Sequence, residues 1–349
     1  MASRNPHDHV NAARRRLLGA SVAGLAWLGA GAPALARGKP GPVLIDAPSN
    51  LGLRPLRPGH VPGAWRAPQA LRARGLAARL GAGDGGAVPS PAYAPAPDPV
   101  TGYRNGANLA AYTPRLAARI GEVLDRHRFP LVLGGDCSVL LGGALALRRR
   151  GRHGLLFIDG HSDFYFPRDA RPLTAAGMDL ALATGHGPDA LVAIDGRKPY
   201  FEECDVVVFG YRDYGTPDVV QTERFEQAAF LRRPLQAVRA QGAATALRDA
   251  LPVLERAALQ GFWIHLDVDV LDPQVMPAVD SPDPGGMTLA ELEDTLATAL
   301  ASPRAVGMEL TIFDPDLDPD GALAERLVGL LQRAFARAGR LATKTGASA

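Results

Sequence analysis

The stretch LLFIDGHSDF, residues 155–164, sets a pattern that recurs along the chain. A short apolar run ends in a cluster of side chains that can bind metal, here Asp159, His161 and Asp163. Short apolar runs bounded by glycine and proline are typical of buried parallel strands. An open parallel sheet presents its functional side chains just beyond the carboxyl ends of its strands. The stretch therefore predicts a buried strand with ligands at its end.

Three further stretches repeat this pattern. They are LVLGGDCS (131–138), WIHLDVDVLDP (263–273) and VGMELTIFDP (306–315). The second of them supplies Asp267 and Asp269, which are two residues apart. Residues at this spacing on an extended chain point to the same side, so one strand can aim a pair of ligands at one spot. We therefore expect the clusters to converge on one site.

The predicted site has more ligands than one divalent ion needs. The hard or borderline donors are Asp159, His161, Asp163, Asp267 and Asp269. Four carboxylates packed together without cations would repel one another and raise one another's pKa values. Two divalent ions, with some of the carboxylates bridging them, would relieve this repulsion. The residues alone thus predict a two-metal site.

The order of these motifs resembles the arginase and agmatinase family of ureohydrolases, which also includes formimidoylglutamases. The matching segments, within residues 43 to 338, are GGDCS (134–138), DGHSD (159–163), DVDVLDP (267–273) and Glu309. The resemblance implies a three-layer α/β/α fold with a central parallel sheet. It also implies two divalent metal ions, manganese first among them, and a metal-bridging hydroxide that attacks a guanidinium carbon. The expected products are an amine and urea or a urea analogue.

The resemblance also implies roles for individual residues. The predicted metal ligands are Cys137, Asp159, His161, Asp163, Asp267 and Asp269. Asp163 is further expected to accept the hydroxide's hydrogen bond and to relay its proton to the leaving amine. Glu309 is expected to face the guanidinium, because a carboxylate can bind that planar fork with two hydrogen bonds. The alternative for Glu309 is a solvent-exposed residue at a strand end.

Two acidic residues within the motifs are not expected to be metal ligands. Asp136 and Asp272 are expected to support loops or ligands rather than to bind metal themselves. Asp136 follows two glycines, which let the backbone approach closely.

Cys137 departs from the family pattern, because most members have histidine at this position. A thiolate suits zinc, iron or cobalt better than manganese, which leaves the metal open. The alternative is a neutral thiol beside the cluster, with one metal weakly held. Relatives that resemble hydroxyarginine hydrolases also carry cysteine here, so a hydroxylated guanidine is a candidate substrate.

The segment TAAGMDL, residues 174–180, is a second departure. Arginases have a proton-shuttling histidine there, together with residues that hold the amino acid's carboxylate, and no histidine aligns in this chain. Asp179 is the nearest titratable candidate for the shuttle, and His186 is the next. Ala176 stands where the carboxylate-binding serine is expected, although Thr174 could supply a hydroxyl. The pattern favours ureohydrolase chemistry and leaves open arginine, hydroxyarginine, other guanidines and formimino compounds.

The first 36 residues have the pattern of an export signal. Arg14, Arg15 and Arg16 precede an apolar run to about residue 32, and residues 34–36 match an A-x-A cleavage signature. The run is too short and too rich in glycine and alanine for a secure membrane span. We predict a twin-arginine-type signal over residues 1–36, a periplasmic location and one domain over residues 37–349. The alternatives are an ordinary secretory signal and an uncleaved anchor.

Composition adds few constraints on partners. The net charge of +2 is close to neutral and gives no indication of a nucleic-acid or anionic partner. Cys137 and Cys204 are not expected to pair, because Cys137 is assigned to the site. The expected partners are a small guanidino molecule and, by resemblance, further copies of the chain. No stable membrane span is expected once the signal is removed.

Helices are predicted between the strands, over about residues 113–127, 139–150 and 289–301. The last begins with a capping box, Thr288 to Glu291. Alternation of strands and helices indicates a parallel sheet. The segment from Gly81 to Gly102, rich in glycine, proline and alanine, is expected to be a surface loop.

Two other functions stay open at this point. An exported, non-catalytic binding protein could keep the fold and the metal pocket without a proton shuttle. A related metal-dependent deacetylase would release acetate, although such enzymes usually use one zinc. The set of metal ligands together with Glu309 favours a hydrolase that acts on linear amidines.

Overall fold

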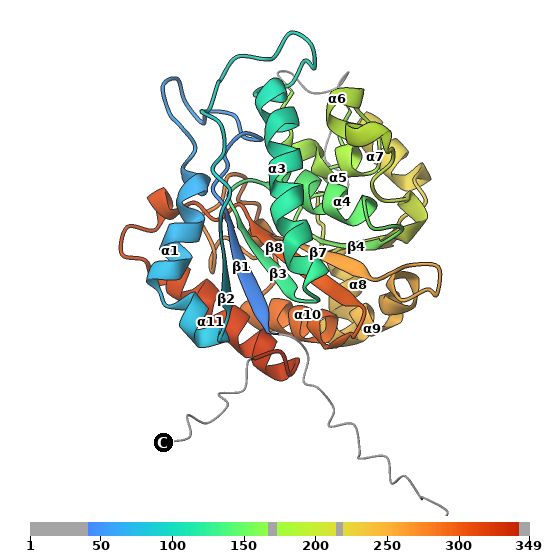
Figure 1. Cartoon of the computed structure of the whole chain (residues 1–349). Coiled ribbons are helices and arrows are strands. Elements are labelled where there is room, and N and C mark those ends of the chain that lie inside the picture. The colour runs from blue at the N-terminus through green and yellow to red at the C-terminus, as the bar shows by residue number, and fades with distance from the viewer. Residues whose placement is uncertain (1–40, 167–172, 214–218, 342–349) are drawn as a thin grey trace, which may run out of the picture. The chain divides into compact units, whose positions relative to one another are not determined.

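The computed structural model describes residues 41–166, 173–213 and 219–341 (Figure 1). The predicted export signal, residues 1–36, lies outside the described residues. Within the described ranges, no helix combines the length and the apolar character that crossing a membrane requires.

Eight parallel strands form one sheet. In spatial order they are β2 Gly83–Ala87, β1 Pro42–Ala47, β3 Phe129–Gly134, β8 Ala305–Thr311, β7 Phe262–Asp267, β4 Gly154–Ile158, β5 Val206–Phe209 and β6 Leu231–Arg233. All neighbouring strands pair in parallel. The predicted α/β fold with a central parallel sheet is confirmed.

Helices cover both faces of the sheet, which makes the three predicted layers (Figure 1). One face packs against α3 Gly106–Asp125, α4 Leu140–Arg148, α5 Asp179–Ala183, α6 Asp189–Val192 and α7 Val219–Gln227. The other packs against α1 Ala67–Ala73, α2 Leu76–Leu80, α8 Leu235–Gln241, α9 Ala243–Leu254, α10 Leu289–Ala301 and α11 Ala322–Arg337. Short 3-10 turns are η1 Gly63–Arg66, η2 Cys137–Val139, η3 Ala176–Met178, η4 Ile194–Gly196, η5 Glu203–Asp205, η6 Val268–Val270 and η7 Pro315–Leu317.

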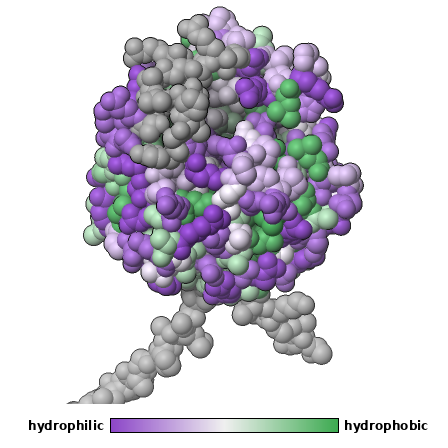
Figure 2. Space-filling model, turned by 180° about the vertical axis from the view of Figure 1, so that it is seen from behind, coloured by the Kyte–Doolittle hydropathy of each residue, from purple (hydrophilic) through white to green (hydrophobic). Residues whose placement is uncertain are grey.

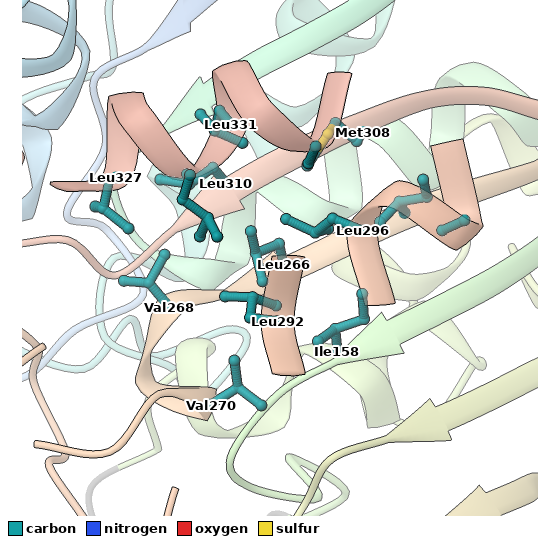
Figure 3. Packing of buried hydrophobic residues seen from close by; sticks show 14 of the residues in the cluster. Ile158, Leu266, Val268, Val270, Leu292, Leu296, Met308, Leu310, Leu327 and Leu331 are labelled. Carbon is teal, nitrogen blue, oxygen red and sulfur yellow. The ribbon is translucent and has the colours of Figure 1, made fainter. Parts of the chain in front are cut away.

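Alternate residues of the central strands supply the two apolar cores. On β7, Ile264 and Leu266 pack into the core beneath α10 and α11, whereas Trp263 packs into the core on the α3 and α4 side. Figure 3 shows Leu266 and Leu310 from the sheet among Leu292 of α10 and Leu327 of α11. Each such buried leucine stabilises the fold by about 1.5–3 kcal/mol. The sheet is thus held from both sides.

The surface contrasts with these cores. Figure 2 shows one face of the molecule, where hydrophilic residues cover most of the area and apolar ones form scattered patches. The large apolar side chains that the described part of the chain exposes are Leu56, Val61, Trp65, Val100 and Leu317. The apolar sides of the described strands and helices are therefore mostly turned inward.

The four strands that carry the ligand motifs are neighbours in the middle of the sheet. β3 pairs with β8, β8 with β7, and β7 with β4. In this register, His265 lies beside Glu309, and Asp267 lies beside Thr311. Because the strands are parallel, their carboxyl ends meet on one side, as the repeated pattern predicted.

Two local predictions need correction. The helix expected from residue 113 begins at Gly106 instead, with Pro114 inside it. Proline removes one backbone hydrogen bond from the helix, but burial of Leu109 and Tyr112 in the preceding turns favours their helical packing. The segment expected to be a loop from Gly81 contains edge strand β2, because pairing with β1 uses backbone groups and Gly85 has no room for a side chain.

Other predicted helices agree with the structure. Residues expected to be helical from Val139 lie in η2 and α4. Helix α10 spans the predicted residues, and both hydrogen bonds of its capping box, between Thr288 and Glu291, are present.

Candidate metal centre

The predicted metal ligands meet at a cavity of about 400 Å³. Five of them line it: Cys137, His161, Asp163, Asp267 and Asp269. The remainder of the wall consists of Leu53, Tyr165, Ala176, Gly177, Asp213, Asp280, Ser281, Asp283 and Ile312. The structure therefore brings together motifs from β3, β4 and β7 that are far apart in the sequence.

Cys137 is placed by the tight connection between β3 and α4. Asp136 caps η2, and its carboxylate accepts hydrogen bonds from Ser138 N (2.9 Å), Gly52 N (3.0 Å) and Ser49 Oγ (2.7 Å). Gly135 lies so close to Ser49 that a side chain there would meet the backbone. Asp136 thus ties two loops together and leaves Cys137 to face the cavity.

The carboxylates at the ends of β4 and β7 are held by backbone groups of the turns after these two strands. Asp267 Oδ1 accepts a hydrogen bond from Asp269 N (2.7 Å), and Asp269 Oδ1 accepts one from Gly160 N (3.1 Å). Asp159 Oδ1 accepts one from His161 N (2.6 Å). These bonds link the two strand ends and leave further carboxylate oxygens available to a cation.

Two groups of potential ligands follow from the distances. In one, Asp159, His161 and Asp269 offer ligand atoms that lie within 4.8 Å of one another. The other group has the same property and consists of Cys137, His265 and Asp267. Each group mixes carboxylate oxygen with nitrogen or sulfur, which are donors that divalent transition metals accept. The donor set therefore fits two divalent ions.

Burial and mutual repulsion dominate the electrostatics of this cluster. Burial raises the pKa of Asp159 to about 6, and Asp269 adds to the rise. Burial also raises the pKa of Asp267, followed by the charge of Asp269, and that of the Cys137 thiol, followed by the charge of Asp267. Without a cation these groups hold their protons more tightly than exposed groups do, whereas bound divalent ions would favour the charged forms.

His161 joins the two strand ends. Its Nδ1 lies 3.0 Å from Asp269 Oδ2, and its Nε2 lies 3.1 Å from Asp283 Oδ2. Burial disfavours the imidazolium, but Asp269 and Asp159 raise its pKa overall. A metal ion at this position would compete with the proton for the same nitrogen.

Asp163 lines the cavity on the same side. Its backbone has φ +41°, an uncommon conformation for a residue with a side chain, and its side chain is buried. Burial raises the pKa of Asp163, and the neighbouring Asp159 raises it further. The roles of Asp163 as metal ligand and proton relay stay predictions. Its position at the cavity wall is compatible with both roles.

Glu309 lies behind the cavity wall rather than on it. Its carboxylate is fully buried, and Oε1 lies 2.8 Å from His265 Nδ1. Strand β8 continues to Thr311, so Glu309 lies within the strand and Ile312 is the residue after it that lines the cavity. Glu309 is therefore not among the residues that line the cavity, and its predicted contact with a guanidinium stays a prediction.

The two candidates for a proton shuttle also lie away from the cavity wall. Asp179 begins α5, is fully buried, and has Oδ2 3.7 Å from His265 Nε2. His186 Nε2 lies 2.8 Å from Glu203 Oε1, and its ring packs against Phe164. A shuttle role for either residue therefore stays a prediction, and it would require a route to the cavity.

His265 is a site residue that sequence reasoning missed. It stands two residues before Asp267 on β7, so both side chains point to the same side of the strand. The spacing rule that selected Asp267 and Asp269 could have selected His265 as well. It was hidden inside the apolar run, where a histidine is easily taken for part of the strand.

Three further acids were also missed, and they make the cavity strongly acidic. Asp213 accepts hydrogen bonds from Ser162 N (2.9 Å) and Ser162 Oγ (2.7 Å), while Asp280 and Asp283 lie on a separate loop. Within the described ranges, the wall of this cavity contains no lysine or arginine. Asp213 stands shortly after the end of buried strand β5, so the strand-end rule could have found it. Asp280 and Asp283 follow no strand-end motif, and the sequence pattern contains no signal for them.

The two cysteines have different surroundings. Cys137 is buried at the centre, where its Sγ lies 2.7 Å from Asp267 Oδ2 and 3.3 Å from Thr311 Oγ1. Cys204 is exposed, and both thiols are free.

Comparison with known proteins identifies the family whose members this chain resembles. The arginase family model matches residues 55–336. The chain is 26% identical over 302 residues to an arginase of Staphylococcus aureus strain COL, covering 84% of this chain and 96% of that protein. It is similar to the native structure of arginase from Bacillus caldovelox, with a TM-score of 0.76 and 27% identity over 85% of this chain and 98% of that one. A formimidoylglutamase structure from Bacillus subtilis shares the fold, with a TM-score of 0.65, 20% identity, and coverage of 87% and 88%.

Proposed function

Because this chain belongs to the arginase family, we propose that it is a metal-dependent hydrolase that cleaves a C–N bond of a guanidino or related amidine compound. The expected products are an amine and urea or a urea analogue. The observation that carries this proposal is the convergence of two groups of metal ligands on one cavity.

Two divalent ions would be held by residues that line this cavity and by Asp159 behind its wall. Asp159, His161 and Asp269 would bind one, and Cys137 and Asp267 would bind the other. When bound, the ions would supply a water of lowered pKa as the nucleophile. Family membership favours manganese, whereas the Cys137 sulfur favours zinc, iron or cobalt.

The protein's own residues favour a cationic substrate. Asp213, Asp280 and Asp283 add negative charge to the wall beyond that of the metal ligands. Burial raises the pKa of Asp280, and the charge of Arg54 opposes this rise. A concave wall of one charge sign concentrates ions of the opposite sign, so a guanidinium or amidinium is the class that this cavity would attract.

The residues of the cavity wall also indicate which group the substrate carries beyond its guanidinium or amidinium. Ala176 and Gly177 form the part of the wall where the family holds an amino acid's carboxylate, and neither offers a polar side chain. An α-carboxylate would also lie close to the acidic wall. We therefore favour a guanidine or amidine without an amino-acid head over arginine.

Asp163 is the residue best placed to hold and move a proton. It lies at the cavity wall, and burial together with the charge of Asp159 raises its pKa, which increases the affinity of its carboxylate for a proton. A carboxyl group in this position could accept a proton from the nucleophile and pass it to the leaving amine.

The test is a release assay on metal-reconstituted protein. The purified chain is stripped with chelator, reloaded separately with manganese, cobalt, iron or zinc, and offered a panel of guanidines, hydroxyguanidines and formimino compounds. Release of urea, hydroxyurea or formamide from one class, dependent on the added metal, would support the proposal and name the substrate class. A protein that binds two ions yet releases no such product from the panel would contradict it.

We further propose that the chain is exported to the periplasm and forms oligomers. Export is supported by the arginine-led pattern of residues 1–36, and oligomerisation by resemblance to the family. Cell fractionation of the full chain and of an Arg14→Lys, Arg15→Lys variant tests export, and light scattering of the purified protein tests assembly. Retention of both forms in the cytoplasm, or a monomer at working concentration, would contradict the respective expectation.

A further inference from the structure

A second polar cluster lies directly behind the cavity, and of its members the proposed function uses Asp159 alone. It contains Asp159, Asp179, His265 and Glu309, all of them fully buried. Buried polar atoms normally have hydrogen-bond partners. Within the described residues, His265 Nε2, Asp159 Oδ2 and both carboxylate oxygens of Asp179 have none. Several buried polar atoms without a partner in one place indicate that a ligand binds between them.

The His265 ring is held in one orientation. Its Nδ1 lies 2.8 Å from Glu309 Oε1, and its face stacks on Phe157 with a centroid distance of 4.6 Å and an angle of 9° between the ring planes. A carboxylate at Nδ1 favours the tautomer with the proton on that nitrogen, which leaves a lone pair on Nε2. Carboxylate support of this kind is what orients histidines that bind metal.

The unpaired Nε2 points toward a group of acidic oxygens. It lies 3.7 Å from Asp179 Oδ2 and 3.9 Å from Asp159 Oδ2. These separations are too long for hydrogen bonds. Two atoms that each lie about 2.1 Å from one ion are separated by roughly 3 to 4 Å, so the observed spacing leaves room for a cation beside Nε2.

The same histidine reaches the centre already described. A ring nitrogen of His265, Cys137 Sγ and a carboxylate oxygen of Asp267 lie within 4.8 Å of one another. Since Nδ1 faces Glu309, Nε2 is the nitrogen left for this group. One cation placed here would bind Nε2 together with the Cys137 sulfur and a carboxylate oxygen of Asp267.

We propose that His265 is a metal ligand of this protein, bonding through Nε2 to the ion that Cys137 and Asp267 also hold, and that Glu309 is its positioning residue. This inference deepens the proposed function and rests on it for the presence of a metal centre. Sulfur and nitrogen on one ion favour zinc, cobalt or iron at that position over manganese.

A rival explanation is a permanently charged imidazolium between Glu309 and Asp179. It would satisfy the charges without a metal, but a charged ring needs a hydrogen-bond acceptor at Nε2, and the nearest carboxylate oxygen of Asp179 is 3.7 Å away. If the ring were such an imidazolium, changing His265 would affect the stability of the metal-free protein and leave metal binding unchanged.

The experiment separates these explanations with His265→Asn in the full chain. The asparagine amide can still donate to Glu309, while no atom remains at the place of Nε2. Wild type, His265→Asn and the matched variant His161→Asn are stripped and titrated with cobalt, followed by metal analysis, chelator competition and the visible spectrum.

We expect His265→Asn to bind one of its two ions at least about 10-fold more weakly than wild type does, with loss of the sulfur-to-cobalt absorption at low metal. His161→Asn should weaken the other ion and keep that absorption. Wild-type affinity for both ions in a folded His265→Asn protein would overturn the proposal.

Thermal unfolding adds a readout that a structural role would not move. A ligand role predicts that His265→Asn reduces the rise in Tm between the chelated and the loaded protein. A purely structural role predicts an equal fall in Tm in both states, which would count against ligation. Glu309→Gln should weaken the same ion about 10- to 100-fold, as expected of residues that orient a ligand, and an unchanged affinity would remove Glu309 from this role.

Failure of this inference and failure of the proposed function give different results. If guanidine hydrolysis is absent but His265→Asn selectively loses an ion, His265 is a ligand in a protein with another reaction. If hydrolysis is present and both ions bind the variant normally, the function stands and His265 is structural.

Discussion

Glu309 on β8 and His265 on β7 are paired across the sheet, with Glu309 Oε1 2.8 Å from His265 Nδ1. Both side chains are fully buried. Because His265 stands two residues before Asp267 and pairs with Glu309, all three side chains belong to the same face of the sheet. The contact shows that Glu309 supports a neighbouring side chain, and its predicted contact with the substrate stays a prediction. It also leaves the β8 side of the cavity to Ile312, an apolar residue.

This arrangement changes how the substrate is expected to be held. A guanidinium in the cavity would meet carboxylates from the loops, such as Asp280 and Asp213, rather than one from the end of β8. Recognition would then depend on general negative charge more than on a single bidentate pair, and such a site can accept several cations of similar size.

Replacing Asp163 by asparagine should lower turnover by about 10²- to 10⁴-fold, the range typical of losing a group that transfers protons. The amide keeps the size of the side chain and removes its capacity to accept a proton. Steady-state product release, with metal content measured on the same sample, checks this. Asp213→Asn is the matched cavity control, for which we expect a smaller loss. Near-wild-type turnover of Asp163→Asn with two ions bound would remove Asp163 from the mechanism.

Replacing Cys137 should change which metal the protein prefers. Cys137→Ser exchanges a soft ligand for a weak oxygen donor, so affinity for zinc and cobalt should fall by roughly 10-fold or more. Cys137→His should shift preference toward manganese. Competition between equal concentrations of the metals, followed by elemental analysis, measures both effects. Cys204→Ser serves as the control because Cys204 is exposed and free, and equal metal preference in all four proteins would indicate that the Cys137 sulfur is not a ligand.

Much of this architecture was predictable from the sequence, because strand ends with ligands two residues apart leave few alternatives. By that rule the side chains of Asp159, His161, Asp267 and Asp269 should converge, and the structure brings them together at or beside one cavity. The rule does not say how the Glu309 side chain lies, since the sequence does not show that β8 continues two residues further, to Thr311.

The remaining gaps have similarly local causes. Asp280 and Asp283 reach the cavity from an irregular loop, and loop paths depend on tertiary contacts that no periodicity records. Edge strand β2 was missed because Gly83–Ala87 has no apolar alternation, while its pairing with β1 needs only backbone groups.

Leu266 should be a strong determinant of stability. It is fully buried between β7 and the α10 and α11 layer, as Figure 3 shows. Leu266→Ala should lower the free energy of unfolding by about 2–5 kcal/mol, through lost burial and the cavity left behind. Urea unfolding of the metal-free protein measures this, with exposed Leu56→Ala as the control. A similar effect of both substitutions would contradict the packing described here.

Asp280 should contribute to the binding of a cationic substrate. Its carboxylate lies on the cavity wall outside the two ligand groups, so Asp280→Asn should raise KM by about 10-fold and leave kcat nearly unchanged, the signature of lost uniform binding. Steady-state kinetics at two salt concentrations measures the change. An equal fall in kcat, with KM constant, would show instead that Asp280 acts in the transition state.

The metal-free protein should lose stability as the pH rises from about 4 to 8. Burial and Asp269 raise the pKa of Asp159 to about 6, and burial also raises the pKa values of Asp163, Asp179 and Asp267. A carboxyl group with a raised pKa in the folded state binds more protons there than in the unfolded chain, so its deprotonation penalises folding above the unfolded pKa of about 4. The raised pKa of His161 acts in the same direction, because its stabilising contribution is complete below the unfolded pKa and is lost as the pH rises through the folded one.

Bound divalent ions replace the missing protons, so the Tm difference between loaded and chelated protein should grow with pH across this window. Calorimetry at pH 5, 6, 7 and 8 with and without chelator measures this difference, and a constant or shrinking one would contradict the origin of the pKa shifts in an uncompensated acidic cluster.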